Sequence, residues 1–338
     1  MSEPTYDLEV RRVLAWVKHE KAPRVLVQAP DGIKRYVKPL LESLEEAGVE
    51  VLVSASHTWG GCDVAISEAR SLGVKHIIHL GHHGPVRFTI PRDLRVLFVP
   101  CKVSTTVKFE ERLPEALAEV GACKVCLVAT VQHAHSLDRI VKSLRPHGIE
   151  AVVDRSNSLP RGVVIGCDYS SALSVKEVDA YLVIAGGIFH ALGLALLTEK
   201  PVISADPFTG EIRVMEEEKR KCIAKRLSAL SNALDASEYG IVVSIKPGQC
   251  NKELAMQIAR LLDKHGLKAR ILVVDEVSWD SLYNLGPPDA YVNTACPRLA
   301  IDDAHLFPAP ALNPGELEYV LRGSLEGYNS AAALSLRL

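Results

Sequence analysis

The sequence lacks the signatures that place a chain in several common protein classes. Residues Met1 to Lys18 carry charges throughout and contain no apolar segment typical of a secretory signal, so we expect a cytoplasmic protein. Neither the Walker nor the dinucleotide type of glycine-rich phosphate loop occurs, which argues against nucleotide binding through such loops. The formal net charge is only -2, which gives no support for nonspecific binding to nucleic acid or to an anionic membrane.

No hydrophobic run is uniform enough to predict a membrane span. The strongest candidate, Ala180 to Leu197, contains the polar His190 and only just reaches the length that a spanning helix needs. Gly186 and Gly187 divide it into a strand-like first half and a helix-like second half. We therefore predict a buried strand that runs into a buried helix, and no membrane partner.

The cysteines do not form a disulfide framework. Eight cysteines in 338 residues, without the small size of a disulfide-rich secreted domain, indicate free thiols or metal ligands in a reducing compartment. Only one CxxC occurs, and its second cysteine falls in a predicted strand. We interpret four cysteines as buried core residues: Cys101, Cys123, Cys126 and Cys222. The role of Cys250 is left open.

What the chain does contain is a threefold repeat of short apolar strands and amphipathic helices. The first copy is predicted to comprise strand Arg24 to Gln28, helix Ile33 to Ala47, strand Glu50 to Ala55, helix Val64 to Leu72, and strands Lys75 to Leu80 and Val96 to Pro100. The second comprises strand Val125 to Thr130, helix Ser136 to Pro146, and strands Glu150 to Asp154, Ala180 to Ala185 and Val202 to Ala205. The third comprises strand Ile241 to Ile245, helix Lys252 to His265, and strands Ala269 to Val274 and Asp289 to Asn293.

A period of roughly 110 residues predicts three related domains of the α/β class, each with a parallel sheet, in a pseudo-threefold arrangement. We expect the boundaries to be 1–112, 113–213 and 214–338. A charged lead helix is predicted from Asp7 to Glu20, and a solvated linker helix from Glu216 to Leu230. The last residues are expected to form a loosely held tail.

One short motif occurs in two of the copies. Gly-Gly-Cys-Asp at Gly60 to Asp63 returns as Gly-Cys-Asp at Gly166 to Asp168, in the same place after the second strand. In the third copy this place is filled by Trp279, and Cys296 instead follows the next strand. We predict that Cys62, Cys167 and Cys296 form one site, because ligands collect at the carboxyl ends of parallel strands.

Three thiolates suit zinc or an iron-sulfur cluster better than magnesium or calcium. A 4Fe-4S cluster normally takes four cysteines, so a cluster held by three keeps one iron open for chemistry. The alternative is that these cysteines only fill small spaces in the core.

Polar and turn residues end the first strand of each copy, and they are candidates for holding a substrate with carboxylate, amino and ribose groups. In the first and third copies they are Gln28, Asp31, Gly32, Lys246, Gly248 and Gln249. Ordinary turn chemistry would explain the same residues equally well. We also expect His79, His82 and His83 to line the cleft, since their spacing matches no zinc motif.

Five motifs in order resemble the archaeal 2-(3-amino-3-carboxypropyl)histidine synthase family of diphthamide biosynthesis. They are Gln-Ala-Pro-Asp-Gly at 28–32, Gly-Gly-Cys-Asp at 60–63, Gly-Cys-Asp at 166–168, Lys-Pro-Gly-Gln at 246–249 and Ala-Cys-Pro at 295–297. The resemblance implies a homodimer of three-domain subunits. It also implies that Cys62, Cys167 and Cys296 hold a central 4Fe-4S cluster.

The resemblance further implies a radical S-adenosylmethionine enzyme of an unusual kind, without the CxxxCxxC loop, which this chain also lacks. Its reaction would transfer a 3-amino-3-carboxypropyl group from S-adenosylmethionine to C2 of a histidine imidazole on translation elongation factor 2. Methylthioadenosine would be released, and an electron donor would be needed. Neither the identity of that donor nor the docking of the factor follows from the sequence.

Two other functions remain open at this point. Quinolinate synthase has a similar outline, with three α/β domains and three cysteines on one cluster, although we find none of its histidine and tyrosine signatures here. A non-catalytic protein that binds zinc or a small molecule is the second alternative. Iron and sulfide analysis of the protein purified without oxygen would separate the cluster readings from the zinc reading.

Overall fold

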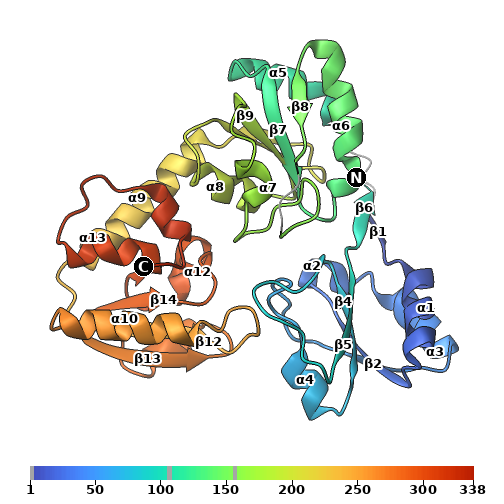
Figure 1. Cartoon of the computed structure of the whole chain (residues 1–338), viewed down its shortest axis with the longest axis horizontal. Coiled ribbons are helices and arrows are strands. Elements are labelled where there is room, and N and C mark those ends of the chain that lie inside the picture. Colours follow the sequence, from blue (N-terminus) through green and yellow to red (C-terminus); the bar gives the residue numbers. More distant parts are fainter. Residues whose placement is uncertain (1–3, 105–108, 155–157) are drawn as a thin grey trace.

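The computed structural model describes residues 4–104, 109–154 and 158–338, which form three lobes around a common centre (Figure 1). Each lobe is built on one sheet with helices against it, so the predicted α/β fold class is confirmed. We call them the first, second and third lobes in chain order. Within the described residues, no helix is both long enough and apolar enough to cross a membrane.

The first lobe contains a four-stranded parallel sheet in the order β3-β2-β4-β5. Its elements are α1 (Val10–Glu20), β2 (Arg24–Gln28), α2 (Asp31–Lys34), α3 (Lys38–Glu46), β3 (Glu50–Val53), α4 (Ile66–Ser71), β4 (His76–Leu80) and β5 (Arg95–Val99). A short antiparallel ribbon of β1 (Thr5–Asp7) and β6 (Lys102–Ser104) lies between this lobe and the second (Figure 1).

The second lobe has the order β11-β10-β9-β7-β8, in which only β11 is antiparallel to its neighbour. Its elements are α5 (Leu113–Glu119), β7 (Lys124–Ala129), α6 (Leu137–Leu144), β8 (Glu150–Val152), α7 (Ser170–Leu173), β9 (Ala180–Ile184), α8 (Phe189–Ala195), β10 (Val202–Ala205) and β11 (Ile212–Val214). The predicted strand and helix within Ala180 to Leu197 are therefore confirmed as β9 and α8.

The third lobe has a parallel sheet in the order β13-β12-β14-β15. Its elements are α9 (Glu216–Asn232), β12 (Glu238–Ser244), α10 (Lys252–Lys264), β13 (Lys268–Val274), α11 (Trp279–Tyr283), β14 (Ala290–Asn293), α12 (Leu299–Asp302), β15 (Ala311–Leu312) and α13 (Leu317–Leu321). Short 3-10 turns also occur in the chain, at Glu110–Arg112, Ala134–Ser136, Arg145–His147, Ala304–Leu306, Pro314–Glu316 and Ser330–Leu334.

The three sheets share one topology. In each, the first strand of the copy pairs with the second on one side and with the third on the other, and a fourth strand follows. The helix after each first strand ends before a glycine with positive φ, at Gly48 (78°), Gly148 (74°) and Gly266 (75°). Glycine occupies this left-handed conformation without the strain of a side chain, which explains the predicted stop in all three copies.

The core of each lobe follows from its central strands. β7 and β9 are buried along almost their whole length, as expected for apolar strands covered on both faces by helices. In the first lobe, Leu40 and Leu44 of α3 lie four residues apart and pack on one face of the sheet. Ala69 of α4 packs on the other face. Each sheet is thus held rigidly, with its loops free to build a site.

Two helix predictions need correction in the first lobe. The lead helix starts at Val10 rather than at Asp7, because Thr5–Asp7 pairs with β6 instead. The predicted helix from Ile33 to Ala47 is two helices, α2 and α3. Pro39 in the first turn of α3 lacks a backbone N–H and favours the start of a new helix at this point.

The prediction of a loosely held tail is wrong. Ser330 and Ala333 are buried, and the Ser330 hydroxyl donates a hydrogen bond to the carbonyl of Leu196 in the second lobe (2.7 Å). The Asn313 side chain donates to the carbonyl of Ala333. The chain end therefore holds the second and third lobes together.

The linker helix α9 is not simply solvated. Arg226 is only 3% exposed, and its guanidinium pairs with the fully buried Glu316 (2.6 Å). The carbonyl of Ala311 accepts a further hydrogen bond from it (2.7 Å). A buried ion pair of this kind is stable only when its remaining hydrogen-bond sites are satisfied, as they are here.

Three of the four cysteines assigned to the core are buried: Cys101, Cys126 and Cys222. Cys123 is the exception and is exposed. It precedes the first residue of β7, where the chain enters the sheet from the surface.

Candidate functional site

A cavity of about 380 Å³ lies where the three lobes meet, and residues of all three line it. The first lobe contributes loops that follow β2, β3 and β4, the second contributes loops that follow β7, β8, β9 and β10, and the third contributes the loop after β14. These are carboxyl ends of parallel strands, where α/β proteins bind their ligands. Cys62, Cys167 and Cys296 all lie in the cavity wall, so the structure brings the three predicted cysteines together.

Cys62 is held by the third lobe. Its carbonyl accepts a hydrogen bond from the backbone N–H of Gly248 (2.8 Å), and its sulfur lies 3.4 Å from Nε2 of Gln249. Gly248 has no room for a side chain, because a Cβ there would lie 2.6 Å from Cβ of Cys62 and 2.1 Å from the carbonyl oxygen of Val86. The Lys-Pro-Gly-Gln turn therefore packs directly against the first Gly-Cys-Asp motif.

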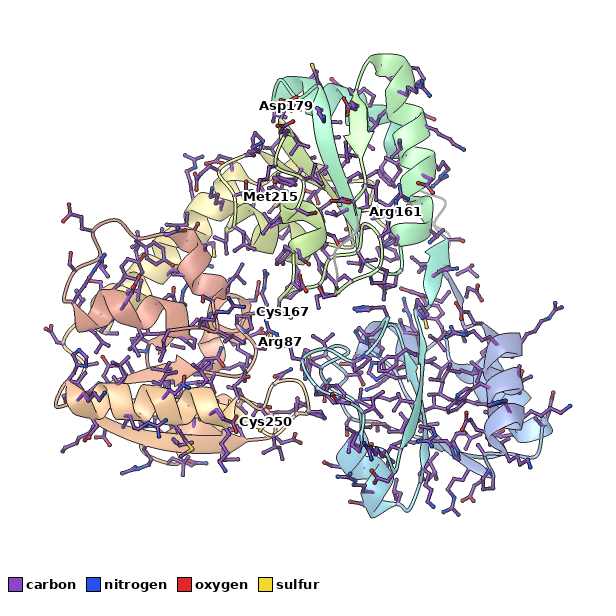
Figure 2. All side chains as sticks on the ribbon, in the orientation of Figure 1. Arg87, Arg161, Cys167, Asp179, Met215 and Cys250 are labelled. Carbon is purple, nitrogen blue, oxygen red and sulfur yellow. The ribbon has the colours of Figure 1, made fainter. Side chains whose placement is uncertain are left out.

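Cys167 is held by the first lobe. Nη2 of Arg87 donates to the Cys167 carbonyl (3.2 Å), and Figure 2 shows the two residues close together at the centre of the molecule. Cys250, by contrast, is exposed and lies further out in the third lobe (Figure 2).

Cys296 is held within its own lobe, and the residues that follow it contact the second lobe. Nδ2 of Asn293 donates to the Cys296 carbonyl (2.7 Å). Two residues after the cysteine, the Arg298 guanidinium lies 3.9 Å from the centre of the Phe189 ring of α8. The ordering of the three lobes around the cavity is thus cyclic: the first holds the second through Arg87, the second meets the third through Phe189, and the third holds the first through Gly248.

Burial favours the protonated form of all three thiols. Burial raises the pKa of Cys62 to about 11 and that of Cys296 to about 12. It also raises the pKa of Cys167, where the nearby Arg87 guanidinium opposes the shift. Cys167 further raises the pKa of Cys62, and Cys62 and Cys167 both raise the pKa of Cys296, because deprotonated sulfurs would repel one another across the cavity.

The donor set fits a polynuclear cluster. Thiolates on one zinc ion lie about 4 Å apart, since each Zn–S bond is about 2.3 Å long. Within the described parts of the chain, no three His, Cys, Asp or Glu side chains are grouped as ligands of a single ion. The three thiols instead surround a shared cavity, an arrangement that suits a cluster whose cysteines bind separate irons.

Neutral imidazoles line the same cavity. His82, His133 and His190 are among its walls, and burial lowers their pKa values to about 4, 4 and 3 respectively. His82 also accepts or donates a hydrogen bond with His79 (2.8 Å), and His79 contacts Gln28 (3.0 Å). The expectation that histidines line the cleft is met by His82 and His83, whereas His79 is fully buried behind them.

The predicted substrate-holding residues divide between two places. Gly32 lines the cysteine cavity. Gln28 and Lys246 line a neighbouring cavity of about 420 Å³ between the first and third lobes. Lys246 is paired with Asp63 (3.1 Å) and Glu276 (3.3 Å), so its charge is neutralised within the protein.

Gln28 and the last polar candidate, Asp31, also have partners within the protein. Gln28 is only 2% exposed and bonds to the carbonyl of Asp63 (2.7 Å) and the N–H of Ala65 (2.9 Å). The Asp31 carboxylate is exposed at the surface and pairs with Lys34 and His57. These bonds position the first Gly-Cys-Asp loop more than they present free groups to a ligand.

No sequence pattern pointed to Arg87, Phe189 or Arg298. Each stands alone in a loop or at a helix start, outside any repeated motif. Arg298 directly follows Cys-Pro, and a cation so near a candidate ligand is the one feature that could have drawn attention to it.

Comparison with known proteins places these observations in a family. Residues 29–330 match the model of the family described as "Putative diphthamide synthesis protein". The chain is 36% identical to 2-(3-amino-3-carboxypropyl)histidine synthase of Pyrococcus horikoshii, with 96% of this chain and 92% of the relative covered. It is 28% identical to subunit 1 of the human enzyme of that name, covering 94% of this chain and 72% of the relative.

Solved structures agree with the sequence comparisons. The crystal structure of Dph2 from Pyrococcus horikoshii is similar with a TM-score of 0.84 and 34% identity, covering 93% of this chain and 91% of the other. The crystal structure of Dph2 from the same organism with a 4Fe-4S cluster is similar with a TM-score of 0.83 and 35% identity, covering 94% and 91%.

Proposed function

Because this chain belongs to the family of diphthamide synthesis proteins, we propose that Cys62, Cys167 and Cys296 hold a 4Fe-4S cluster. The enzyme transfers a 3-amino-3-carboxypropyl group from S-adenosylmethionine to C2 of a histidine on translation elongation factor 2, the first step of diphthamide biosynthesis. The observation that carries the assignment of ligands is the convergence of one cysteine from each lobe on one cavity.

When bound, the cluster would supply the electron for cleavage of the bond between sulfur and Cγ of S-adenosylmethionine, and the protein supplies binding and orientation. The first contribution of the protein is three thiols, one from each lobe, which would leave one of four irons without a cysteine ligand. A second contribution is the exclusion of water by the apolar cavity wall, which protects reactive intermediates.

The six predicted substrate-holding positions have different proposed roles. Gly32 stays a candidate for direct contact with S-adenosylmethionine, because it lines the cysteine cavity. Asp31 lies just beyond that wall, beside His57. For the others we propose a positioning role, because their bonds fix the Cys62 loop: Gln28, Lys246, Gly248 and Gln249.

A homodimer is also part of the proposal, and the edge strand β13 is the surface that supports it. This strand has seven residues, against four in β3 and three in β8 at the equivalent edges. Its apolar residues Ile271 and Val273 are 40% and 68% exposed. A long apolar edge with unpaired backbone groups is expected to pair with another strand.

The charges along β13 favour a second copy as the partner. Lys268 and Arg270 lie in its first half, and Asp275 and Glu276 follow its end. When two copies pair antiparallel about a twofold axis near Ile271, the basic half of each faces the acidic end of the other. Sedimentation of the wild type should give a dimer, Val273→Lys should give a monomer, and Val53→Lys on the matching edge β3 should remain dimeric. A monomeric wild type contradicts this proposal.

The reaction requires an electron donor, which we propose to be supplied in the cytoplasm where the translation factor works. The direct test of function is a mixture of reduced protein, S-adenosylmethionine and archaeal elongation factor 2, followed by mass spectrometry of the factor. We expect an added aminocarboxypropyl group on one histidine, and none when that histidine is replaced by glutamine. Formation of quinolinate from its precursors, with an unmodified factor, would contradict the assignment.

A further inference from the structure

Arg298 is a buried cation at the junction of the second and third lobes. Its side chain is only 3% exposed. Asp302 holds it from one side through two hydrogen bonds, from Nε (2.6 Å) and from Nη2 (2.8 Å). The Phe189 ring covers one face of the guanidinium at 3.9 Å. The remaining nitrogen, Nη1, is buried and has no hydrogen-bond partner among the described residues.

The surroundings leave room for this side chain and for nothing larger. A Cβ added to Gly193 would lie 2.4 Å from Nη1 and 1.9 Å from the hydroxyl of Tyr169. A Cβ added to Gly166 would lie 2.5 Å from the Phe189 ring. Two glycines of the second lobe therefore allow the close approach of Arg298, Phe189 and Tyr169 beside the cysteine cavity.

The charge of Arg298 lies beside the cysteines. This residue lines the same cavity as Cys167 and Cys296, and it follows Cys296 by two residues in the chain. A charge in this position is poorly screened, because solvent and salt reach it little. Asp302 carries the compensating charge but is 26% exposed, so water screens it more strongly than it screens the arginine.

We propose that Arg298 is a positioning residue that sets the reduction potential of the iron-sulfur cluster, and that Asp302 limits how much of its charge the cluster experiences. This inference rests on the proposed cluster at Cys62, Cys167 and Cys296. The step concerned is the addition of one electron to the cluster, with no bond made or broken. A fixed positive charge favours the more negative, reduced form, and protein charge and burial are known determinants of such potentials.

Arg87 provides a matched control. It also lies near Cys167, whose carbonyl accepts its hydrogen bond at 3.2 Å, but its side chain is exposed. Solvent therefore screens its charge more strongly than it screens the buried Arg298, and its removal should shift the potential in the same direction by a smaller amount. The two arginines compare the same charge near the same cysteine, once buried and once exposed.

The test is an equilibrium redox titration of the cluster, followed by electron paramagnetic resonance, on the wild type and on single variants. Arg298→Gln should make the cluster at least tenfold harder to reduce by a given donor, a midpoint shift of about 59 mV to more negative values for one electron. Arg298→Lys should shift it less in the same direction. Asp302→Asn should shift it to more positive values, and Arg87→Gln should shift it to more negative values by less than Arg298→Gln does.

Shifts of opposite sign in the midpoint potentials of Arg298→Gln and Asp302→Asn indicate an electrostatic role. A structural role would shift both potentials in the same direction, because both substitutions would loosen the site. If Arg298→Gln cannot hold a cluster, the midpoint potentials of Arg298→Lys and Asp302→Asn still test the proposal. The inference is overturned if Asp302→Asn leaves the potential unchanged or lowers it, or if Arg87→Gln shifts it as far as Arg298→Gln. Absence of iron and sulfide in the wild type would instead overturn the proposed function, and this is measured before any titration.

Discussion

The two Gly-Cys-Asp motifs have the same sequence and the same place in their lobes, yet their aspartates make different contacts. Asp63 is 6% exposed, and its carboxylate accepts a hydrogen bond from Lys246 of the third lobe (3.1 Å). Asp168 accepts hydrogen bonds from the Ser170 N–H (2.9 Å) and the Ser158 hydroxyl (2.8 Å), both in its own lobe. The first aspartate joins two lobes, whereas the second shapes a local turn.

This difference shows which part of the site the repeat determines. The repeated topology places Cys62 and Cys167 at equivalent strand ends. The contacts that hold one lobe against the next are different at each junction: Arg87 at one, Phe189 with Arg298 at another, and Gly248 with Lys246 at the third. The site is threefold in its ligands and asymmetric in its packing.

The largest expected effect is loss of the cluster when any one of the three cysteine ligands is replaced, because the three lobes contribute equivalent ligands. Cys62→Ala, Cys167→Ala and Cys296→Ala should each lose the cluster, since two thiolates would leave two of the four irons without a protein ligand. Cys126→Ala should keep it, because that thiol is buried inside β7. Iron and sulfide analysis after anaerobic reconstitution measures this, and an intact cluster in the Cys296 variant would remove the proposed set of ligands.

The second prediction compares the two aspartates directly. Asp63→Ala removes the buried partner of the largely buried Lys246 and leaves only Glu276 (3.3 Å) and the more distant Asp275 (3.9 Å), so it should cost about 2 kcal/mol of unfolding free energy. Asp168→Ala removes hydrogen bonds that the neutral donors Ser158 and Ser170 make to the carboxylate in a partly exposed turn, and should cost about 1 kcal/mol. Denaturant unfolding of the apoprotein measures both. Equal costs would show that the two motifs have the same structural role.

The third prediction concerns the glycines in the two motifs. A Cβ at Gly61 would lie 2.1 Å from the carbonyl oxygen of Gly84, a backbone atom that cannot rotate away. At Gly166 the nearest atoms belong to the Phe189 side chain, which can move. We expect Gly61→Ala to lower the free energy of unfolding by about 2 to 3 kcal/mol and Gly166→Ala by about 1 kcal/mol. Thermal or denaturant unfolding of the two variants measures these losses. A larger loss for Gly166→Ala than for Gly61→Ala would contradict this account of the packing.

The smallest predicted effect is on the pH dependence of stability. Burial lowers the pKa of His133 to about 4, below its value of about 6.5 in the unfolded chain. The unfolded state therefore binds more protons, and stability is lost as pH falls from 6.5 towards 4. We expect His133 to account for about 1 kcal/mol of the loss between pH 7 and pH 5.5.

Two variants check this expectation. His133→Gln should flatten the pH dependence of apoprotein unfolding, and His19→Gln at an exposed position should not. His82 in the first lobe, whose pKa is also lowered to about 4, keeps more contact with solvent and should contribute less than His133. An unchanged pH profile in His133→Gln would show that this imidazole is not held neutral by burial.

Much of the fold was predictable because local patterns determine it. The bounds predicted for β2 and β10 match the structure, and the three glycine stops at Gly48, Gly148 and Gly266 have the expected positive φ. Apolar runs bounded by turns and helices ended by glycine are signals within one segment. The predicted domain boundaries are not tested by these observations and stay predictions.

The parts that could not be predicted depend on contacts between distant segments. The break between α2 and α3 had a local signal in Pro39, but the burial of Ser330 against Leu196 had none. The site shows the same division. Three cysteines were found through the repeat and the resemblance, whereas Arg87 and Arg298 act only across lobe boundaries.

The central claim is that one cysteine from each lobe binds a single 4Fe-4S cluster in the shared cavity. The most direct measurement is the iron and acid-labile sulfide content of the wild-type protein purified without oxygen. We predict about four irons and four sulfides per chain. A protein that contains zinc in place of iron, or iron without sulfide, would contradict the claim.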